Sequence, residues 1–302
     1  MAHRFQYNPN KVRMLSSIVI GPRKTATAKR LLAAAVSTSR SLSTRLAEPE
    51  LDIGDLQHRF QSMAPQMAQA LQEQGYYTKT EFLDSAMIQL LRNQSISLRD
   101  QGRFEPSWSE TIVNGRTTRF DKPGVHACEP DGRDYDSAPD LIVYMSGLLQ
   151  ALPSALNPLL TTSTVDIDLS NAQFNAKLAV TLPGGSVYPL HIDNAEGLAV
   201  GDTRKLTCIL YLNPSHEPQN GGELQIVLDD STTVDLPPSG GRLVAFWSDE
   251  IPHQVLPMAP HADAKDISLD RYALTIWIPT GNAAVIHNPS SKFRALADIA
   301  FP

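Results

Sequence analysis

The stretch PGGSVYPLHIDN (183–194) places a histidine and a carboxylate, His191 and Asp193, two positions apart after a short apolar run. Side chains alternate across a β-strand, so residues two apart point to the same face of a sheet. An imidazole and a carboxylate on one face can bind adjacent positions around one metal ion. The alternative is a solvated strand end, because a His-x-Asp pattern arises easily by chance in a chain with eight histidines.

A second histidine and an arginine follow further along the chain. His253 lies 62 residues after His191, and RYALTIW (271–277) reads as a strand that opens on Arg271. Two histidines and one carboxylate form a facial triad, which leaves metal positions open for a chelating cosubstrate and dioxygen. An arginine at the end of a buried strand needs an anion, and its planar fork fits a carboxylate. A salt bridge to Asp270 is the alternative.

The region around these residues has the pattern of an all-β fold. Short apolar, β-branched stretches are separated by turn residues, which predicts a sandwich, jelly roll or barrel. The gap between His253 and Arg271 predicts a loop over roughly 258–269. The candidate strands are 174–182, 187–192, 204–212, 223–228, 242–247 and 271–278.

The preceding region has helical periodicity. From Leu51, apolar residues recur every three to five positions, which predicts a helix broken or restarted near Pro65 and ended by Gly75. The spacing of Thr78 and Glu81 predicts a capping box that opens a second helix.

A polar segment separates these helices from the strands. Residues 114–139 are rich in Gly, Pro and Asp, which predicts an extended loop. Ser137 is expected to cap a helix from about 140 to 151. The predicted architecture is therefore α+β, with an N-terminal α-helical layer packed on a β core.

The β region resembles a known family. KLTCILYLNP (205–214), GGELQI (221–226) and RLVAFWSDEIPHQV (242–255) complete, with the two stretches above, a pattern similar to the prolyl 4-hydroxylase superfamily of iron(II)- and 2-oxoglutarate-dependent dioxygenases. The hypoxia-inducible-factor prolyl hydroxylase type is the nearest likeness. The resemblance implies a double-stranded β-helix (jelly-roll) core over 165–282, a helical part over 48–160, and one catalytic domain over 48–302.

The resemblance also assigns roles to individual residues. It implies that His191, Asp193 and His253 bind Fe(II). Arg271 and Tyr211 would bind the distal carboxylate of the cosubstrate 2-oxoglutarate, and Thr275 would line the cosubstrate pocket. Tyr188 and Trp277 would border the target residue, although plain aromatic core is an equal alternative for Trp277.

The implied reaction is prolyl 4-hydroxylation of a protein or peptide, with dioxygen consumed and succinate and carbon dioxide released. Ascorbate would keep the iron reduced, and the segment 114–139 would help to hold the peptide. One alternative is an oxygenase of the same fold that acts on a free amino acid or small metabolite. Another is a non-catalytic module that binds 2-oxoglutarate.

Charge and composition limit the other functional classes. Residues 1–47 carry nine Lys or Arg and no acid, which leaves 17 basic and 32 acidic residues in 48–302. This acidic part argues against a nucleic-acid-binding surface. No apolar run is long enough to span a membrane. The basic N-terminal segment is expected to be disordered or a transit peptide for the mitochondrion or plastid, and cytoplasm or nucleus is the alternative location.

Overall fold

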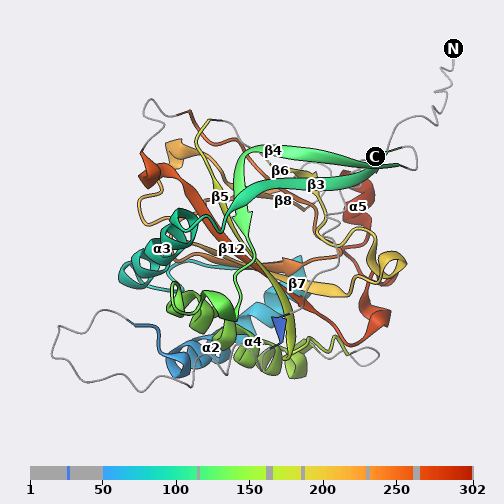
Figure 1. The fold of residues 1–302 in the computed structure, drawn as a ribbon. Coiled ribbons are helices and arrows are strands. Elements are labelled where there is room, and N and C mark those ends of the chain that lie inside the picture. Colours follow the sequence, from blue (N-terminus) through green and yellow to red (C-terminus); the bar gives the residue numbers. More distant parts are fainter. Residues whose placement is uncertain are drawn as a thin grey trace, which may run out of the picture.

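Two antiparallel β-sheets face each other in the computed structural model, and helices cover the outer face of the larger sheet (Figure 1). The structure describes residues 26–27, 50–113, 116–160, 166–184, 188–228, 232–260 and 266–300. The larger sheet contains β1 (Ala26–Thr27), β2 (Tyr76–Lys79), β3 (Glu105–Val113), β4 (Arg116–Cys128), β5 (Gln173–Thr181), β7 (Arg204–Tyr211), β10 (Leu243–Trp247) and β12 (Arg271–Pro279). Its order is β2-β10-β7-β12-β5-β4-β3, and β1 pairs with β5.

The smaller sheet and the helices complete the core. The smaller sheet contains β6 (Tyr188–His191), β8 (Leu224–Val227), β9 (Thr233–Leu236) and β11 (His253–Val255), in the order β6-β11-β8-β9. The helices are α2 (Ile53–Gln74), α3 (Ser85–Asp100), α4 (Pro139–Leu160) and the short α5 (Ala295–Ala300). This arrangement of a helical layer on two facing sheets agrees with the predicted α+β jelly roll.

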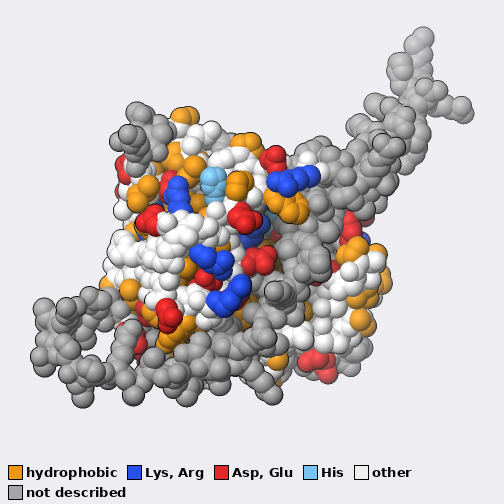
Figure 2. All heavy atoms as spheres, in the orientation of Figure 1, with side chains coloured by type: hydrophobic (Ala, Val, Ile, Leu, Met, Phe, Trp, Pro, Cys, Tyr) orange, Lys and Arg blue, Asp and Glu red, His pale blue; other side chains and the backbone are white. Residues whose placement is uncertain are grey.

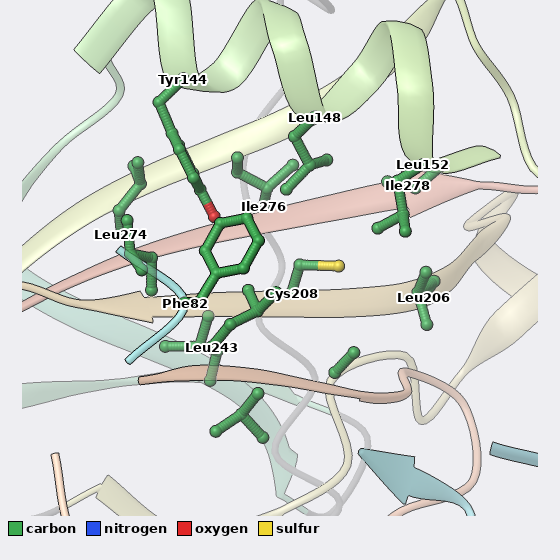
Figure 3. Packing of buried hydrophobic residues seen from close by; sticks show 14 of the residues in the cluster. Phe82, Tyr144, Leu148, Leu152, Leu206, Cys208, Leu243, Leu274, Ile276 and Ile278 are labelled. Carbon is green, nitrogen blue, oxygen red and sulfur yellow. The ribbon is translucent and has the colours of Figure 1, made fainter. Parts of the chain in front are cut away.

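Helix α4 packs on the two central strands of the larger sheet. Its residues Tyr144, Leu148 and Leu152 are fully buried and point toward β7 and β12 (Figure 3). The strand residues that meet them alternate along the chain: Leu206 and Cys208 on β7, and Leu274, Ile276 and Ile278 on β12. The residues between them, such as Thr207 and Thr275, must therefore point into the space between the two sheets.

Helix α2 corrects the prediction of a break near Pro65. The helix runs without interruption from Ile53 to Gln74 and ends, as predicted, at Gly75, whose φ is 81°. Pro65 and Gln61 are both exposed, so the carbonyl that loses its helical hydrogen bond can bind water. The buried side of the helix packs against α4 and keeps the helix intact.

The predicted cap at Thr78 is wrong. Residues Tyr76–Lys79 form an edge strand paired with β10, and α3 begins at Ser85, where the side chain of Asp84 accepts a hydrogen bond from the Met87 amide. The predicted cap at Ser137 is also wrong. The first free amides of α4 donate instead to the side chain of Gln94 on α3, a contact between helices that the local sequence does not indicate.

The predicted loop over 114–139 is wrong for half of its length. Residues 116–128 form β4, which pairs with β3 and with β5. Its exposed residues Arg119, Asp121 and Pro123 give the segment a composition that resembles that of a loop. The predicted loop over 258–269 agrees with the structure where it is described, except for a single helical turn at Ile267–Leu269.

The basic segment 1–47 lies outside the described residues, apart from the two residues of β1. Predictions about that segment, and the division into domains, stay predictions. Among the described helices, none is long and apolar enough to cross a membrane. On the face shown in Figure 2, basic and acidic side chains are interspersed rather than gathered by sign.

The side chain of Asn213 fixes the start of β12, next to Arg271. Its Oδ1 accepts from the Tyr272 amide at 2.7 Å and from Arg92 at 3.1 Å. Its Nδ2 donates to the carbonyls of Pro238 and Tyr272 at 2.7 and 3.1 Å. One buried amide thus joins the end of β7, the turn before β10, helix α3 and β12.

Replacing this amide is expected to destabilise the fold. Asn213→Ala leaves buried donors and acceptors without partners, each of which costs about 1–3 kcal/mol, so we expect a loss of about 3 kcal/mol in the free energy of unfolding. Urea denaturation measures this loss. The exposed Asn93→Ala is the control and should change stability by less than about 0.5 kcal/mol. Equal stabilities of the two variants would contradict this role for Asn213.

Candidate metal centre

The three predicted metal ligands converge in the space between the sheets. His191 ends β6, His253 opens β11, and the two residues lie opposite each other in the antiparallel pair. Asp193 Oδ1 is 3.5 Å from His191 Nε2 and 3.8 Å from His253 Nε2. All three side chains are buried, and one ligand atom from each lies within 4.8 Å of the others. Elsewhere among the described residues, no comparable cluster of His, Cys, Asp and Glu occurs.

Backbone carbonyls orient both imidazole rings. His191 Nδ1 lies 2.8 Å from the carbonyl oxygen of Pro189, and His253 Nδ1 lies 3.0 Å from that of Ile251. A carbonyl oxygen can only accept, so each Nδ1 carries the proton and each Nε2 keeps its lone pair. This arrangement is typical of metal-binding histidines.

The carboxylate of Asp193 is oriented by two other strands. Its Oδ2 accepts hydrogen bonds of 2.9 Å from Thr207 Oγ1 on β7 and from Trp277 Nε1 on β12. Thr207 is held in turn by Ser248, with 2.7 Å between the hydroxyl oxygens. Because Oδ2 is occupied, Oδ1 remains the oxygen that faces the two Nε2 atoms and binds a metal through one oxygen.

The protonation states also suit a metal. Burial alone would raise the pKa of Asp193, but His253, His191 and Arg204 together hold that pKa far below its usual range. Burial, followed by the charge of His191, lowers the pKa of His253 to about 4. At neutral pH the site therefore offers an ionised carboxylate and a neutral His253, which are the forms that bind metal. The donor set of two imidazoles and one carboxylate oxygen fits Fe(II).

The other end of the space is suited to an anion. Arg271 is buried, and its guanidinium carbon lies 5.0 Å from the centre of the Tyr211 ring. Its Nε donates to the carbonyl of Gly222 at 2.8 Å, and no described carboxylate pairs with it. Asp270, the alternative partner considered from the sequence, pairs with Arg99 instead. The hydroxyl of Tyr211 is also buried without a described hydrogen-bond partner.

All eight residues that the sequence predicted for the site line one cavity. Its volume is about 600 Å³, which includes the solvent-filled space at its opening. Tyr188, Thr275 and Trp277 share this cavity with the three metal ligands, Arg271 and Tyr211. The remaining wall is mostly apolar and comes from Ala179, Ile209, Leu224, Val255 and Ala273. The structure thus brings the predicted residues together, whereas their individual roles stay predictions.

Sequence reasoning missed three polar residues of this region. Thr207 orients Asp193, Lys177 lines the cavity, and Lys122 lies next to Tyr188. Strand alternation could have found Thr207, which lies two and four positions before Ile209 and Tyr211. Lys177 has the same relation to Ala179, whereas Lys122 lies in the segment that was interpreted as a loop.

Comparison with known proteins supports the interpretation of this site. The sequence model of the 2OG-Fe(II) oxygenase superfamily matches residues 176–279, a range that includes all eight residues. The chain is similar to this superfamily over that range. The chain is similar to the hypoxia-inducible factor prolyl hydroxylase of Caenorhabditis elegans, with 28% identity over 225 residues that cover 72% of this chain and 28% of that protein. Human Egl nine homolog 1 is 27% identical over 217 residues, or 68% of this chain and 44% of that protein. The chain thus spans less than half the length of these relatives.

Solved structures confirm the predicted fold. A Trichoplax adhaerens prolyl hydroxylase, solved with a hypoxia-inducible factor peptide fragment, superposes with a TM-score of 0.60 at 23% identity, covering 77% of this chain and 96% of that one. A prolyl 4-hydroxylase of Phytophthora capsici gives a TM-score of 0.58, also at 23% identity, covering 83% and 70%. The α+β fold with a double-stranded β-helix core is therefore confirmed.

The hydrogen bond from Trp277 to Asp193 gives a direct prediction. Trp277→Phe removes a donor that fixes the carboxylate, and such losses weaken metal binding about 10–100-fold. Titration with Mn(II), followed by electron paramagnetic resonance, measures this affinity without turnover. Trp108→Phe on β3 is the control, because Trp108 contacts Arg119 and not the metal ligands. Equal Mn(II) affinities of the two variants would show that Trp277 does not orient Asp193.

Proposed function

We propose that this protein is an oxygenase that hydroxylates a prolyl residue of a protein or peptide at C4, and that it converts 2-oxoglutarate and dioxygen to succinate and carbon dioxide. The observation that carries the proposal is one cavity that holds both a facial His-Asp-His set and a buried arginine that no carboxylate of the described residues pairs with. Prolyl specificity rests on the relatives named prolyl hydroxylases.

Residues at one end of the cavity bind the metal, and residues at the other end bind 2-oxoglutarate. His191, Asp193 and His253 hold the metal and leave one face of it open. Arg271 receives the distal carboxylate of 2-oxoglutarate through its fork, and the free hydroxyl of Tyr211 donates to the same group. Fe(II) held there would supply the redox-active centre for the reduction of dioxygen. Two electrons for this reduction come from the decarboxylation of 2-oxoglutarate and two from the hydroxylated C–H bond, and ascorbate would restore iron that becomes oxidised.

The remaining walls protect and orient the reactants. Thr275 and the apolar residues around it exclude water from the cosubstrate, which limits side reactions. Tyr188 and Trp277 border the position of the target residue. The complete set of metal-binding and anion-binding side chains argues against a module that binds 2-oxoglutarate without turnover.

The first test is Fe(II)-dependent formation of succinate from 2-oxoglutarate, with ascorbate and a library of proline-containing peptides. Wild type is expected to form succinate and to add one oxygen atom to a peptide proline, as mass spectrometry detects. His191→Ala should abolish both products because it removes a ligand, whereas the exposed His58→Ala should keep both. If wild type formed no succinate at any iron, ascorbate or peptide concentration, the proposed catalysis would be wrong.

The role of Arg271 has its own test. Arg271→Met removes the cation that pairs with a buried carboxylate, a loss of about 2–5 kcal/mol, so the KM for 2-oxoglutarate should rise at least about 30-fold. The KM of Arg271→Lys for 2-oxoglutarate should lie between that of Arg271→Met and that of wild type, because lysine keeps the positive charge but cannot form the two parallel hydrogen bonds of a guanidinium. The exposed Arg133→Met is the control. An unchanged KM in Arg271→Met would show that the distal carboxylate binds elsewhere.

A further inference from the structure

The segment after β12 returns to the two turns that carry metal ligands, and His287 in this segment contacts both. Its ring Nε2 lies 2.7 Å from the carbonyl oxygen of Asn194, the residue after Asp193. Its backbone amide donates to Asp249 Oδ2 at 2.8 Å, on the turn that leads to His253. One histidine outside the cluster of metal ligands thus joins the two turns.

The ring of His287 is a hydrogen-bond donor. A carbonyl oxygen can only accept, so Nε2 carries the proton and donates to Asn194. Two other bonds fix the same stretch of backbone. Arg204 donates to the Asp193 carbonyl at 2.7 Å. The Asn194 amide donates to the Ser248 carbonyl at 2.8 Å. Three successive backbone groups next to the metal-binding carboxylate are therefore fixed, and His287 fixes the last of them.

The backbone of His287 has an unusual conformation. Its φ is 52°, in the left-handed region that few residues other than glycine adopt. Such conformations persist only where the surrounding contacts enforce them, and they cluster at functional sites. Here the bonds to Asn194 and Asp249 enforce it. Gly197 leaves the space for the ring, because a Cβ at Gly197 would lie 2.7 Å from His287 Cε1. The packing therefore fixes the direction of the ring.

A buried ion pair holds Asp249 in place. Lys205 Nζ lies 2.9 and 3.1 Å from the two carboxylate oxygens of Asp249, and both side chains are buried. Lys205 also donates to the carbonyl of Val285 at 3.0 Å, two residues before His287. Separating a buried ion pair is strongly unfavourable. The segment that carries His287 is therefore anchored next to the residue that binds its amide.

The carboxylate of Asp193 depends on a fixed backbone. Its Oδ2 is bonded to Thr207 and Trp277 on the larger sheet, so a shift of the Asp193 backbone would either break one of these bonds or turn Oδ1 away from the metal position. A metal site needs its ligands within about 0.5 Å of their required positions. The contact from His287 limits such a shift from the side opposite to the larger sheet's hydrogen bonds along the chain, at the residue that follows the ligand.

We propose that His287 is a positioning residue of the metal centre. Held by Asp249, it donates to Asn194 and thereby sets the position of the Asp193 carboxylate. The proposal rests on the proposed metal-dependent function. It adds to that function a residue from outside 176–279, the range that the superfamily model matches.

Two substitutions separate the hydrogen bond of His287 from its backbone conformation. Asparagine tolerates the left-handed region, but its shorter side chain does not reach Asn194. The amide nitrogen of glutamine extends about as far as histidine Nε2 and restores the donor. Loss of a bond that orients a ligand weakens metal binding about 10–100-fold, so the dissociation constant of Mn(II) should rise about tenfold in His287→Asn. His287→Gln should restore most of the affinity, as a titration followed by electron paramagnetic resonance measures.

The spectrum of bound Mn(II) separates positioning from a general loss of stability. At saturating metal, His287→Asn should change the zero-field splitting, which depends on ligand geometry, and His287→Gln should restore it. Asn157→Ala is the matched control. Asn157 is half-buried like His287 and forms two hydrogen bonds with the backbone of Leu169, but it lies on α4, on the outer face of the larger sheet. Its loss should lower the urea midpoint and leave the Mn(II) affinity and spectrum unchanged.

Three results would overturn the proposal. Equal Mn(II) affinity and spectrum in His287→Asn and wild type would show that the contact does not position the carboxylate. Failure of His287→Gln to restore either property would show that the hydrogen bond is not the cause. An equal loss of affinity in Asn157→Ala would assign the effect to general stability. Failure of wild type to bind Mn(II) at all would instead refute the metal centre on which the proposal rests.

Discussion

The alternation of side chains along β7 and β12 is the constraint on which the site depends. One face of these strands packs under α4, with Cys208 and Ile276 among its buried residues (Figure 3). Thr207 and Thr275 alternate with these residues along the strands and therefore face the opposite sheet. A shift of one residue in register would exchange the two faces. The polar residues would then lie under the helix, and the apolar residues would face the cavity. Each large apolar side chain that became exposed to water would cost about 1.5–3 kcal/mol of stability. Packing of the core under α4 therefore fixes which side chains of β7 and β12 face the site.

The alternation of β7 and β12 positions the predicted metal ligand Asp193. The residue follows β6 in the smaller sheet, but its Oδ2 is held by Thr207 and Trp277 from the central strands of the larger one. His253 comes from β11, beside β6. The carboxylate therefore joins the two sheets at the point where their separation must match the size of one ion. The same strand β12 then carries Arg271 at its other end, which sets the spacing between the metal and the anion site.

The sequence predicted the site better than its surroundings, for physical reasons that individual residues illustrate. His191, Asp193 and Arg271 could be predicted because short strands carry their chemistry at fixed spacing and the pattern resembles a known superfamily. The strands β5, β7 and β12 were predicted within one or two residues because buried strands have apolar, β-branched sequences. Pro65 was misinterpreted because packing against α4 outweighs a local break. β4 was missed because its pairing with β3 and β5, and not its own polar composition, makes it a strand. The same error hid Lys122.

The central claim is that one cavity binds a metal through His191, Asp193 and His253 and binds 2-oxoglutarate between that metal and Arg271. A crystal structure with Mn(II) and 2-oxoglutarate, grown without oxygen, tests it most directly. The account predicts an anomalous peak next to the Nε2 atoms of His191 and His253 and next to Oδ1, but not Oδ2, of Asp193. It also predicts that the distal carboxylate of 2-oxoglutarate lies on Arg271 and that the hydrogen bond from Trp277 to Asp193 is intact. A metal bound through both oxygens of Asp193, or a distal carboxylate on Lys122 and Lys177, would contradict it.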